Sequence, residues 1–270
     1  MQFRVSFLEW ILLLIVVLEA IAIRVVSRHW NSYRQARREE GRGKPWKLPR
    51  APLEALDPIF AIPHPGLGHA IATEVAFISS GQTLMVGVPT DYESWILAVL
   101  ARRALNMFEF GTCTGRTTYL WARNSPPNAS VHTITLHPDE LDAYRSGDSD
   151  NPEDRADALH ESSFQTFVYS GTDVEHKIVQ LYGDSKAFDH SAFKGQMDLL
   201  FVDGSHARSY VESDSEKALQ MLKPGGFILW HDYRGPFRSG GVFHALNALG
   251  ASLPLIHIEG TSLVAHRSPQ

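Results

Sequence analysis

Carboxylate and imidazole side chains follow two apolar runs in the C-terminal part of this 270-residue sequence. Asp203 and His206 come after the first run, and His231 and Asp232 end the second. If the runs are neighbouring parallel strands, both groups lie at the carboxyl edge of one sheet, where ligands bind. We expect the four side chains to converge on one crevice, where they could hold a divalent metal ion or take a proton from a substrate. The alternative is that the aspartates only cap the helices that follow.

A glycine-containing turn at residues 109–115, Glu-Phe-Gly-Thr-Cys-Thr-Gly, is a second candidate site. Gly111 lets the chain turn off a strand, and Gly115 would let a ligand approach the helix that follows. The free N–H groups of that helix suit a carboxylate or a phosphate. The G-x-G-x-x-G spacing of dinucleotide-binding proteins is absent, because position 113 is Cys. An amino-acid carboxylate is therefore favoured over a pyrophosphate, and a tight connection without a ligand is the alternative.

Asp184 and Ser185 follow a further apolar run and lie at the same predicted edge. An ionised carboxylate only accepts hydrogen bonds, so Asp184 could accept one from an adenine amino group. Capping of the next helix by Asp184 is the alternative.

Alternating strand and helix patterns must position these residues, and such alternation predicts a parallel sheet. The predicted strands are residues 107–110, 131–136, 177–182, 197–203 and 227–232, and the predicted helices are residues 91–104, 116–124 and 213–223. Pro224, Gly225 and Gly226 are expected to end the last helix. Two β-rich runs around Glu259 and Gly260 predict a closing hairpin.

Composition excludes several classes of protein. A hydrophobic fraction of 44% with 20% charged residues excludes global disorder. A net charge of -5 gives no electrostatic argument for binding nucleic acid. Cys113 is the single cysteine, so no internal disulfide forms, which suits a reducing compartment.

An ordered set of motifs carries a family resemblance over roughly residues 85–267. The motifs are FEFGTCTGRTTYLWA, IVQLYGDSKAF, DLLFVDGSHARSYVESDSEKAL, LKPGGFILWHDY and IEGTSLVAHR. Together they resemble a bacterial group of class I S-adenosylmethionine-dependent methyltransferases, related to small-molecule and sugar O-methyltransferases with GDS, DGxH and HDY motifs. The resemblance implies an α/β, Rossmann-like fold: a doubly wound, mostly parallel seven-stranded sheet with a C-terminal antiparallel hairpin, preceded here by an apolar helix.

The resemblance also implies roles for residues. The residues expected at the cofactor S-adenosyl-L-methionine are Glu109, Gly111, Thr112 and Gly115 at its methionine end, Asp184 and Ser185 at its adenine, and Asp203 near its sulfonium. Asp203 and Asp232 would hold a divalent cation such as Mg²⁺, and the residues expected to act on the acceptor are Asp232, His231 and His206. Some metal-dependent relatives have an acid in place of His231, so Mg²⁺ dependence stays open.

One position departs from the family pattern. The second strand of such proteins usually ends in an acid that binds the ribose, but this chain has Thr135 and His137 there, and Asp139 could substitute. The polar segment 146–167 is read as a solvated loop with one helix, or alternatively as a lid that binds the acceptor.

The N-terminal part of the sequence predicts a helix that attaches the protein to a membrane. Residues 7–26 are mostly apolar and long enough to cross a bilayer, although Glu9, Glu19 and Arg24 make insertion marginal. The basic stretch that follows predicts a single-pass anchor with the domain on the cytoplasmic face. A helix that forms a homodimer is the main alternative, and a signal peptide fits less well.

The predicted organisation is thus an apolar helix in residues 1–30, a basic, Pro/Gly-rich linker in residues 31–84, and a methyltransferase domain in residues 85–270. The predicted activity is methyl transfer to an oxygen of a small-molecule, saccharide or lipid-linked acceptor. A membrane-attached adapter that keeps the cofactor-binding fold without catalysis is the alternative, and a nucleotide-dependent oxidoreductase is less favoured.

Overall fold

The computed structural model describes residues 15–27, 30, 48–61, 63–64, 68–69, 75–77, 87, 89–148 and 150–270. The chain divides into two compact units, Met1–Trp46 and Lys47–Gln270. In the first unit, residues 15–27 are helical. Residues 7–14 of the predicted apolar helix lie outside the described residues. Within the part of the chain that the structure describes, no helix is both long and apolar enough to cross a membrane.

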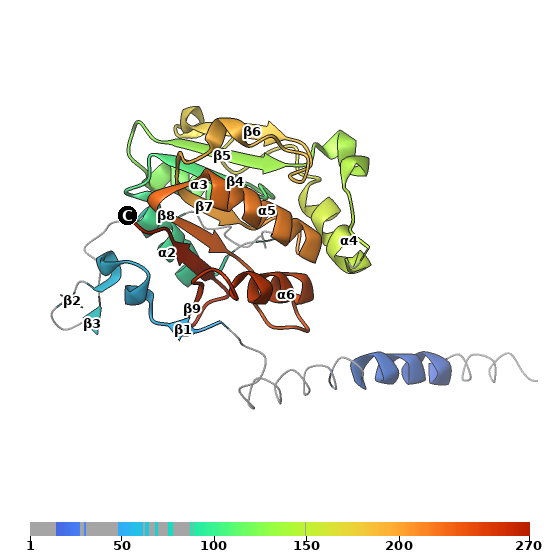
Figure 1. Cartoon of the computed structure of the whole chain (residues 1–270). Coiled ribbons are helices and arrows are strands. Elements are labelled where there is room, and N and C mark those ends of the chain that lie inside the picture. The colour runs from blue at the N-terminus through green and yellow to red at the C-terminus, as the bar shows by residue number, and fades with distance from the viewer. Residues whose placement is uncertain are drawn as a thin grey trace, which may run out of the picture. The chain divides into compact units, whose positions relative to one another are not determined.

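The second unit is built on one sheet of eight strands, in the order β1-β9-β10-β8-β7-β4-β5-β6 (Figure 1). The strands are β1 Arg50–Ala51, β4 Asn106–Phe110, β5 Ser130–Thr135, β6 Ile178–Tyr182, β7 Met197–Val202, β8 Leu222–Trp230, β9 Ile256–Ile258 and β10 Val264–Arg267. Strands β4 to β8 pair in parallel, whereas β10 is antiparallel to both β8 and β9. The mostly parallel sheet with a C-terminal hairpin is confirmed.

The predicted count of seven strands is wrong, because β1 adds an eighth. Arg50 and Ala51 lie opposite His257 and Ile258, so β1 extends the β9 edge in parallel. A second, two-stranded sheet pairs β2 Pro63–His64 with β3 Gly68–His69. Part of the segment predicted as a linker therefore has regular structure.

The α-helices in the described part of this unit are α2 Asp91–Ala101, α3 Arg116–Asn124, α4 Pro152–Glu161, α5 Arg208–Met221 and α6 Gly240–Leu249. A capping box starts α2: the Thr90 hydroxyl accepts from the Glu93 N–H, and the Glu93 carboxylate accepts from the Thr90 N–H. Pro224, Gly225 and Gly226 lie within β8 and do not end a helix, because the chain passes directly from α5 into β8 at Leu222.

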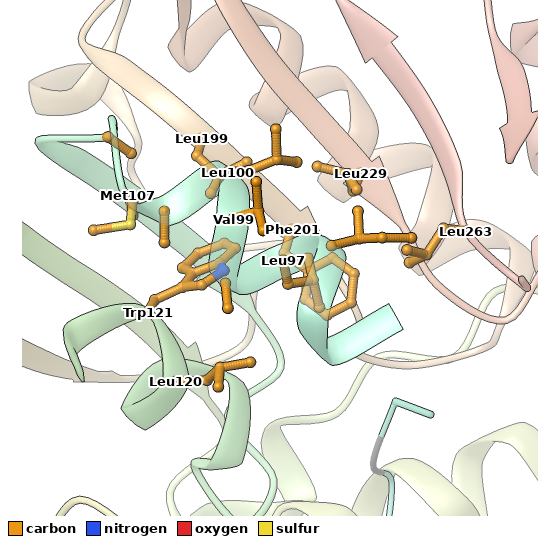
Figure 2. Packing of buried hydrophobic residues seen from close by; sticks show 14 of the residues in the cluster. Leu97, Val99, Leu100, Met107, Leu120, Trp121, Leu199, Phe201, Leu229 and Leu263 are labelled. Atoms are coloured by element: carbon orange, nitrogen blue, oxygen red, sulfur yellow. The ribbon is translucent and has the colours of Figure 1, made fainter. Parts of the chain in front are cut away.

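One hydrophobic cluster joins α2 and α3 to the sheet. Leu97 and Leu100 of α2 and Trp121 of α3 pack around Leu199 and Phe201 of β7 (Figure 2). The Trp121 and Phe201 rings lie 6.2 Å apart. Burial of each such side chain contributes about 1.5–3 kcal/mol, so this face fixes the strands firmly.

Residues from the predicted linker complete this core. Leu53, Leu56, Ile59 and Phe60 belong to the same cluster, none of them more than 8% exposed. Successive residues of a strand face opposite sides, so Leu200 of β7 points to the other face of the sheet, where α5 packs against β7 and α6. The arrowhead of β5 points toward the side where α4 lies (Figure 1).

Candidate active site

The carboxyl ends of four parallel strands, β4 to β7, open onto a cavity of about 480 Å³. The residues proposed from the sequence that line it are Gly111, Asp184, Ser185 and Asp203. The other three cofactor candidates, Glu109, Thr112 and Gly115, do not line it.

Gly111 stands where the turn after β4 crosses the turn after β7. Its φ is +101°, and a Cβ atom there would lie 2.2 Å from the Asp203 carbonyl oxygen and 2.6 Å from the Gly204 Cα. Only glycine fits this backbone conformation and this close approach. The requirement for glycine comes from the protein backbone itself.

Gly115 is covered by protein and does not face the cavity. It is the N-cap of α3 with a φ of +77°, and a Cβ there would lie 2.7 Å from the Tyr169 ring and 2.9 Å from Phe167. The two aromatic rings stack at 5.2 Å, and the Val168 N–H donates to the Thr114 carbonyl. The segment after α4 therefore lies over the N-terminus of α3, which the sequence analysis expected to be open to a ligand.

Glu109 is a buried hydrogen-bond acceptor between β4, β5 and α3. The hydroxyls of Thr118 and Thr133 both donate to its Oε2 atom, and Thr133 also contacts the Thr112 hydroxyl at 2.8 Å. Because it is buried, the pKa of Glu109 is raised to about 8, so its carboxyl is largely neutral at pH 7.

Glu109→Gln is expected to remove a pH dependence of stability. The folded state holds a proton on Glu109 from the ordinary pKa of 4.5 up to about 8, so the wild type loses stability as pH rises through that window. Glutamine keeps one oxygen for both threonine hydroxyls and never ionises. Urea unfolding should show equal stabilities near pH 4.5 and an advantage of about 4 kcal/mol for the variant at pH 8.

A parallel pH dependence of the two proteins would contradict a neutral Glu109. Asp57→Asn is a suitable control for the assay, because Asp57 is also buried but already pairs with arginines.

The four residues after β7 and β8 lie together, as two connected pairs. His206 Nε2 is 2.6 Å from Asp232 Oδ2, and His231 Nδ1 is 3.0 Å from Asp203 Oδ1. His231 Nδ1 is also 3.4 Å from Asp232 Oδ1, which links the pairs. Arg234 adds a contact of 2.7 Å to Asp232 Oδ1. Asp232 has a φ of +61°, a backbone conformation that Asp and Asn tolerate better than most residues.

Glu93 also belongs to this cluster, and its role was not predicted from the sequence. Its Oε2 lies 3.5 Å from His231 Nε2, and its Oε1 accepts from the N–H and hydroxyl of Ser262 at 2.6 and 2.8 Å. It therefore ties the start of α2 and the hairpin loop to His231. The capping-box pattern Thr90-x-x-Glu93 was visible in the sequence, but a partner 138 residues away was not.

Charge pairing keeps both imidazoles protonated at neutral pH. Burial disfavours the charged forms, but Asp203 and Glu93 raise the pKa of His231 well above its usual value. Asp232 raises the pKa of His206 to about 9, although burial alone would lower it. In turn, His206, His231 and Arg234 hold the pKa of Asp232 below its usual range although burial opposes this. The imidazoles are thus hydrogen-bond donors at neutral pH, suited to an anionic or partly anionic oxygen.

A second cavity, of about 730 Å³, adjoins the first and is mostly polar. It is lined by Gly87, Cys113, Glu161, Asp203, His206, His231, Asp232 and Arg234. Cys113, Glu161 and Asp203 line both cavities. A ligand in one cavity would therefore lie next to a ligand in the other.

Glu161 reaches this junction from the C-terminal end of α4, within the segment read from sequence as a loop or lid. Burial raises the pKa of Glu161 to about 7, opposed by the charge of His206 and assisted by those of Asp203 and Asp232. Thr135 lines the first cavity and its hydroxyl donates to Ser162 at 3.3 Å. Asp139, suggested as a substitute ribose acid, has a side chain 80% exposed and lines neither cavity.

Three of the clustered residues present atoms that suit a metal ion. One ligand atom each from Asp203, His231 and Asp232 lies within 4.8 Å of the others. The second ring nitrogen of His231 faces Glu93, and a carboxylate in that position is typical of metal-bound histidines.

One protein-family model matches this part of the chain. Residues 108–233, which include the ends of β4 to β8, match the model of a family described as a methyltransferase domain. No curated protein matches the sequence.

Three solved structures illustrate the similarity. The O-methyltransferase TomG from Streptomyces achromogenes, in complex with SAM, is 17% identical over 67% of this chain and 82% of its own, with a TM-score of 0.48. A putative O-methyltransferase from Klebsiella pneumoniae is 17% identical over 68% and 84%, with a TM-score of 0.46. An O-methyltransferase from Bacillus cereus, in complex with SAH, is 15% identical over 67% and 83%, also with 0.46. Residues 108–233 thus match a methyltransferase domain, in agreement with the resemblance of the sequence motifs to class I S-adenosylmethionine-dependent methyltransferases.

Proposed function

We propose that this protein transfers a methyl group from S-adenosylmethionine to an oxygen atom of a small-molecule, saccharide or lipid-linked acceptor. The observation that carries the proposal is the junction of two cavities at Cys113, Glu161 and Asp203. The cavity at the ends of β4 to β7 would hold the cofactor, and the polar cavity would hold the acceptor. Methyl transfer is an in-line displacement, so the alignment of two ligands is its main requirement.

The residues of the polar cavity divide into donors and acceptors. The cofactor would supply an electrophilic methyl group. His206, which is protonated and uses Nε2 for Asp232, would donate from its other ring nitrogen to the acceptor oxygen and stabilise negative charge on it. His231, whose ring nitrogens face Asp203 and Glu93, would hold the two aspartates in position. Asp232, held by His206 and Arg234, would orient the acceptor hydroxyl and take its proton. Glu161 is the second candidate for the proton, because a pKa of about 7 matches a base that works near neutral pH.

We also propose that Asp203, His231 and Asp232 bind a divalent cation. The donor set fits such an ion, because two carboxylates and one imidazole converge and Glu93 orients the imidazole. Binding of the ion would displace the proton from His231 Nδ1. The ion would lower the pKa of a bound hydroxyl. Because one ligand is a nitrogen atom, the set suits Mn²⁺ or a similar ion. It could also hold Mg²⁺, although Mg²⁺ prefers oxygen ligands.

Binding of S-adenosylhomocysteine tests the proposed function first. Calorimetry on the full chain should give a dissociation constant in the micromolar range. Labelled S-adenosylmethionine should then transfer its methyl group to a hydroxyl compound in a panel of phenols, saccharides and isoprenoid-linked sugars. Absence of binding would refute the proposal. Binding without transfer to any acceptor would favour the non-catalytic adapter.

For the N-terminal helix we propose membrane attachment, with the domain on the cytoplasmic face. The apolar side chains of this helix, including Ile15, Leu18, Ile23 and Val26, are each at least 45% exposed in the single chain. Deletion of residues 1–30 should release the protein from the membrane fraction and leave its unfolding midpoint unchanged, because the core cluster begins at Leu53. Size-exclusion chromatography completes the test. A full-length protein that is soluble without detergent, and that becomes monomeric after the deletion, would show a dimerisation helix instead.

Deletion of residues 1–61 is the matched control. It also removes β1 and the core residues Leu53, Leu56, Ile59 and Phe60, so this variant should unfold or aggregate.

A further inference from the structure

Two buried carboxylate oxygens at the first cavity have no hydrogen-bond donor among the described residues. They are Oδ2 of Asp184 and Oδ1 of Asp214. Both residues line the cavity and are only 6% and 2% exposed. The other oxygen of Asp184 accepts from the Lys186 N–H at 3.0 Å. The Tyr210 hydroxyl, which accepts from the Arg145 N–H at 2.8 Å, lies beside the Asp184 carboxylate and also lines the cavity. Arg145 Nε lies 3.9 Å from Asp184 Oδ2, too far for a hydrogen bond.

Asp214 comes from the buried side of α5. It lies within the motif formed by residues 198–219, but no role was predicted for it from the sequence. Burial raises its pKa to about 7, and the Ser185 side chain is hydrogen-bonded to it. The nearby charges are Asp184 and Lys186 after β6, and Lys217 on α5. The Lys217 ammonium donates at 2.8 Å to the carbonyls of Ser185 and Lys186, so it is engaged elsewhere.

A buried acceptor without a donor is unfavourable, and a ligand that supplies the donor recovers the loss. Two such acceptors on one cavity call for a ligand group with two N–H donors. A primary amino group on an aromatic ring meets this need, because it has two N–H bonds and carries no charge. A carbonyl oxygen in the same place would face two acceptors and be excluded.

We propose that Asp214 and Asp184 together bind the 6-amino group of adenine, one N–H to each carboxylate, and that Asp214 thereby restricts the cavity to adenine. This assignment rests on the proposed function, since it takes the cavity as the cofactor site. Asp214 acts here as a binding and specificity residue and takes no part in the methyl transfer. Thr135 and Ser162, which line the same cavity, are left for other parts of the ligand.

The first experiment needs no variant. Calorimetry on the full chain compares S-adenosylhomocysteine with S-inosylhomocysteine, in which the 6-amino group is replaced by a carbonyl oxygen. At pH 8, where Asp214 is mostly ionised and only accepts hydrogen bonds, the wild type should bind the inosyl compound at least about 100-fold more weakly, as expected of a site built to accept from N–H donors. Equal affinities would overturn the proposal. No binding of S-adenosylhomocysteine would overturn the proposed function itself, and this proposal with it.

The second experiment uses Asp214→Asn, with Glu216→Gln as the matched control. Glu216 lies on the same helix but is exposed and outside this cavity. Asp214→Asn should bind S-adenosylhomocysteine about tenfold more weakly. The asparagine amide can turn its NH₂ group toward a carbonyl oxygen, so the preference over the inosyl compound should fall at least about tenfold. Glu216→Gln should change neither value.

The pH dependence of the affinity for S-adenosylhomocysteine gives a third test. An N–H donor favours the ionised carboxylate, so wild-type affinity for S-adenosylhomocysteine should rise between pH 6 and pH 8. This rise should persist in Glu216→Gln and disappear in Asp214→Asn, with circular dichroism used to confirm that each variant is folded. If folded Asp214→Asn keeps wild-type affinity, base preference and pH dependence, Asp214 does not contact the adenine.

Discussion

Gly111→Ala is expected to destabilise the folded domain by about 3 kcal/mol or more. The methyl group would lie 2.2 Å from the Asp203 carbonyl oxygen, on a residue with a φ of +101°. Neither backbone can move away easily, because the preceding residue Phe110 pairs with Val202 in neighbouring strands β4 and β7. The urea midpoint should fall sharply, and binding of S-adenosylhomocysteine should be lost together with folding.

Gly171→Ala is the control for backbone strain alone. Its φ is +74°, but a Cβ there would meet nothing within 4 Å. It should cost only about 1 kcal/mol. If Gly111→Ala is as stable as this control and fails only to bind the cofactor, the glycine is needed for the ligand and the backbone contact is not limiting. If Gly111→Ala equals the wild type in both stability and cofactor binding, the turns after β4 and β7 do not approach each other as closely as described here.

Much of the fold was predictable from sequence, because its strands are apolar runs bounded by turns. Strands β4 to β8 and the closing hairpin each carry such a pattern, and parallel strands joined by helices place their carboxyl ends at one edge. Strand β1 was missed because it consists of only Arg50 and Ala51, in a segment rich in proline and basic residues. Its pairing depends on the free edge of β9, which no local pattern reveals.

The candidate site was predictable only where residues follow strands directly. Asp203, His206, His231 and Asp232 lie together for that reason. Glu93, Glu161 and Asp214 reach the site from helices, and their positions depend on how those helices pack against the sheet.

For Glu109, the role predicted from the sequence differs from the position of the side chain in the structure. The resemblance assigned it to the cofactor, but its side chain lies between Thr118 and Thr133 in the interior, away from the cavity. The direction of one side chain near the end of a strand depends on which hydroxyl groups surround it. Those groups come from a neighbouring strand and a helix, so the order of residues along β4 alone does not specify it.

Asp232→Asn is expected to lower the rate of methyl transfer about 10²–10⁴-fold, the usual size of general acid–base catalysis. Asparagine keeps the shape of the side chain and tolerates a φ of +61°, so the variant should fold. It removes the negative charge that His206 and Arg234 share. Affinity for S-adenosylhomocysteine should stay within about threefold of wild type, because Asp232 lines only the polar cavity.

Two further substitutions separate the possible roles of Asp232 in that loss of rate. If Asp203 and Asp232 hold a cation, Asp203→Asn should lose Mn²⁺ binding and activity together, and a chelator should reproduce the effect. If Asp232 acts as a base without a metal, chelator should have no effect on the wild type. Glu161→Gln tests the other proton acceptor: a loss of rate there, with Asp232→Asn fully active, would move the proton transfer to Glu161. Wild-type rates in all three variants would mean that the cluster only supports the fold, and the mechanism proposed for it would be wrong.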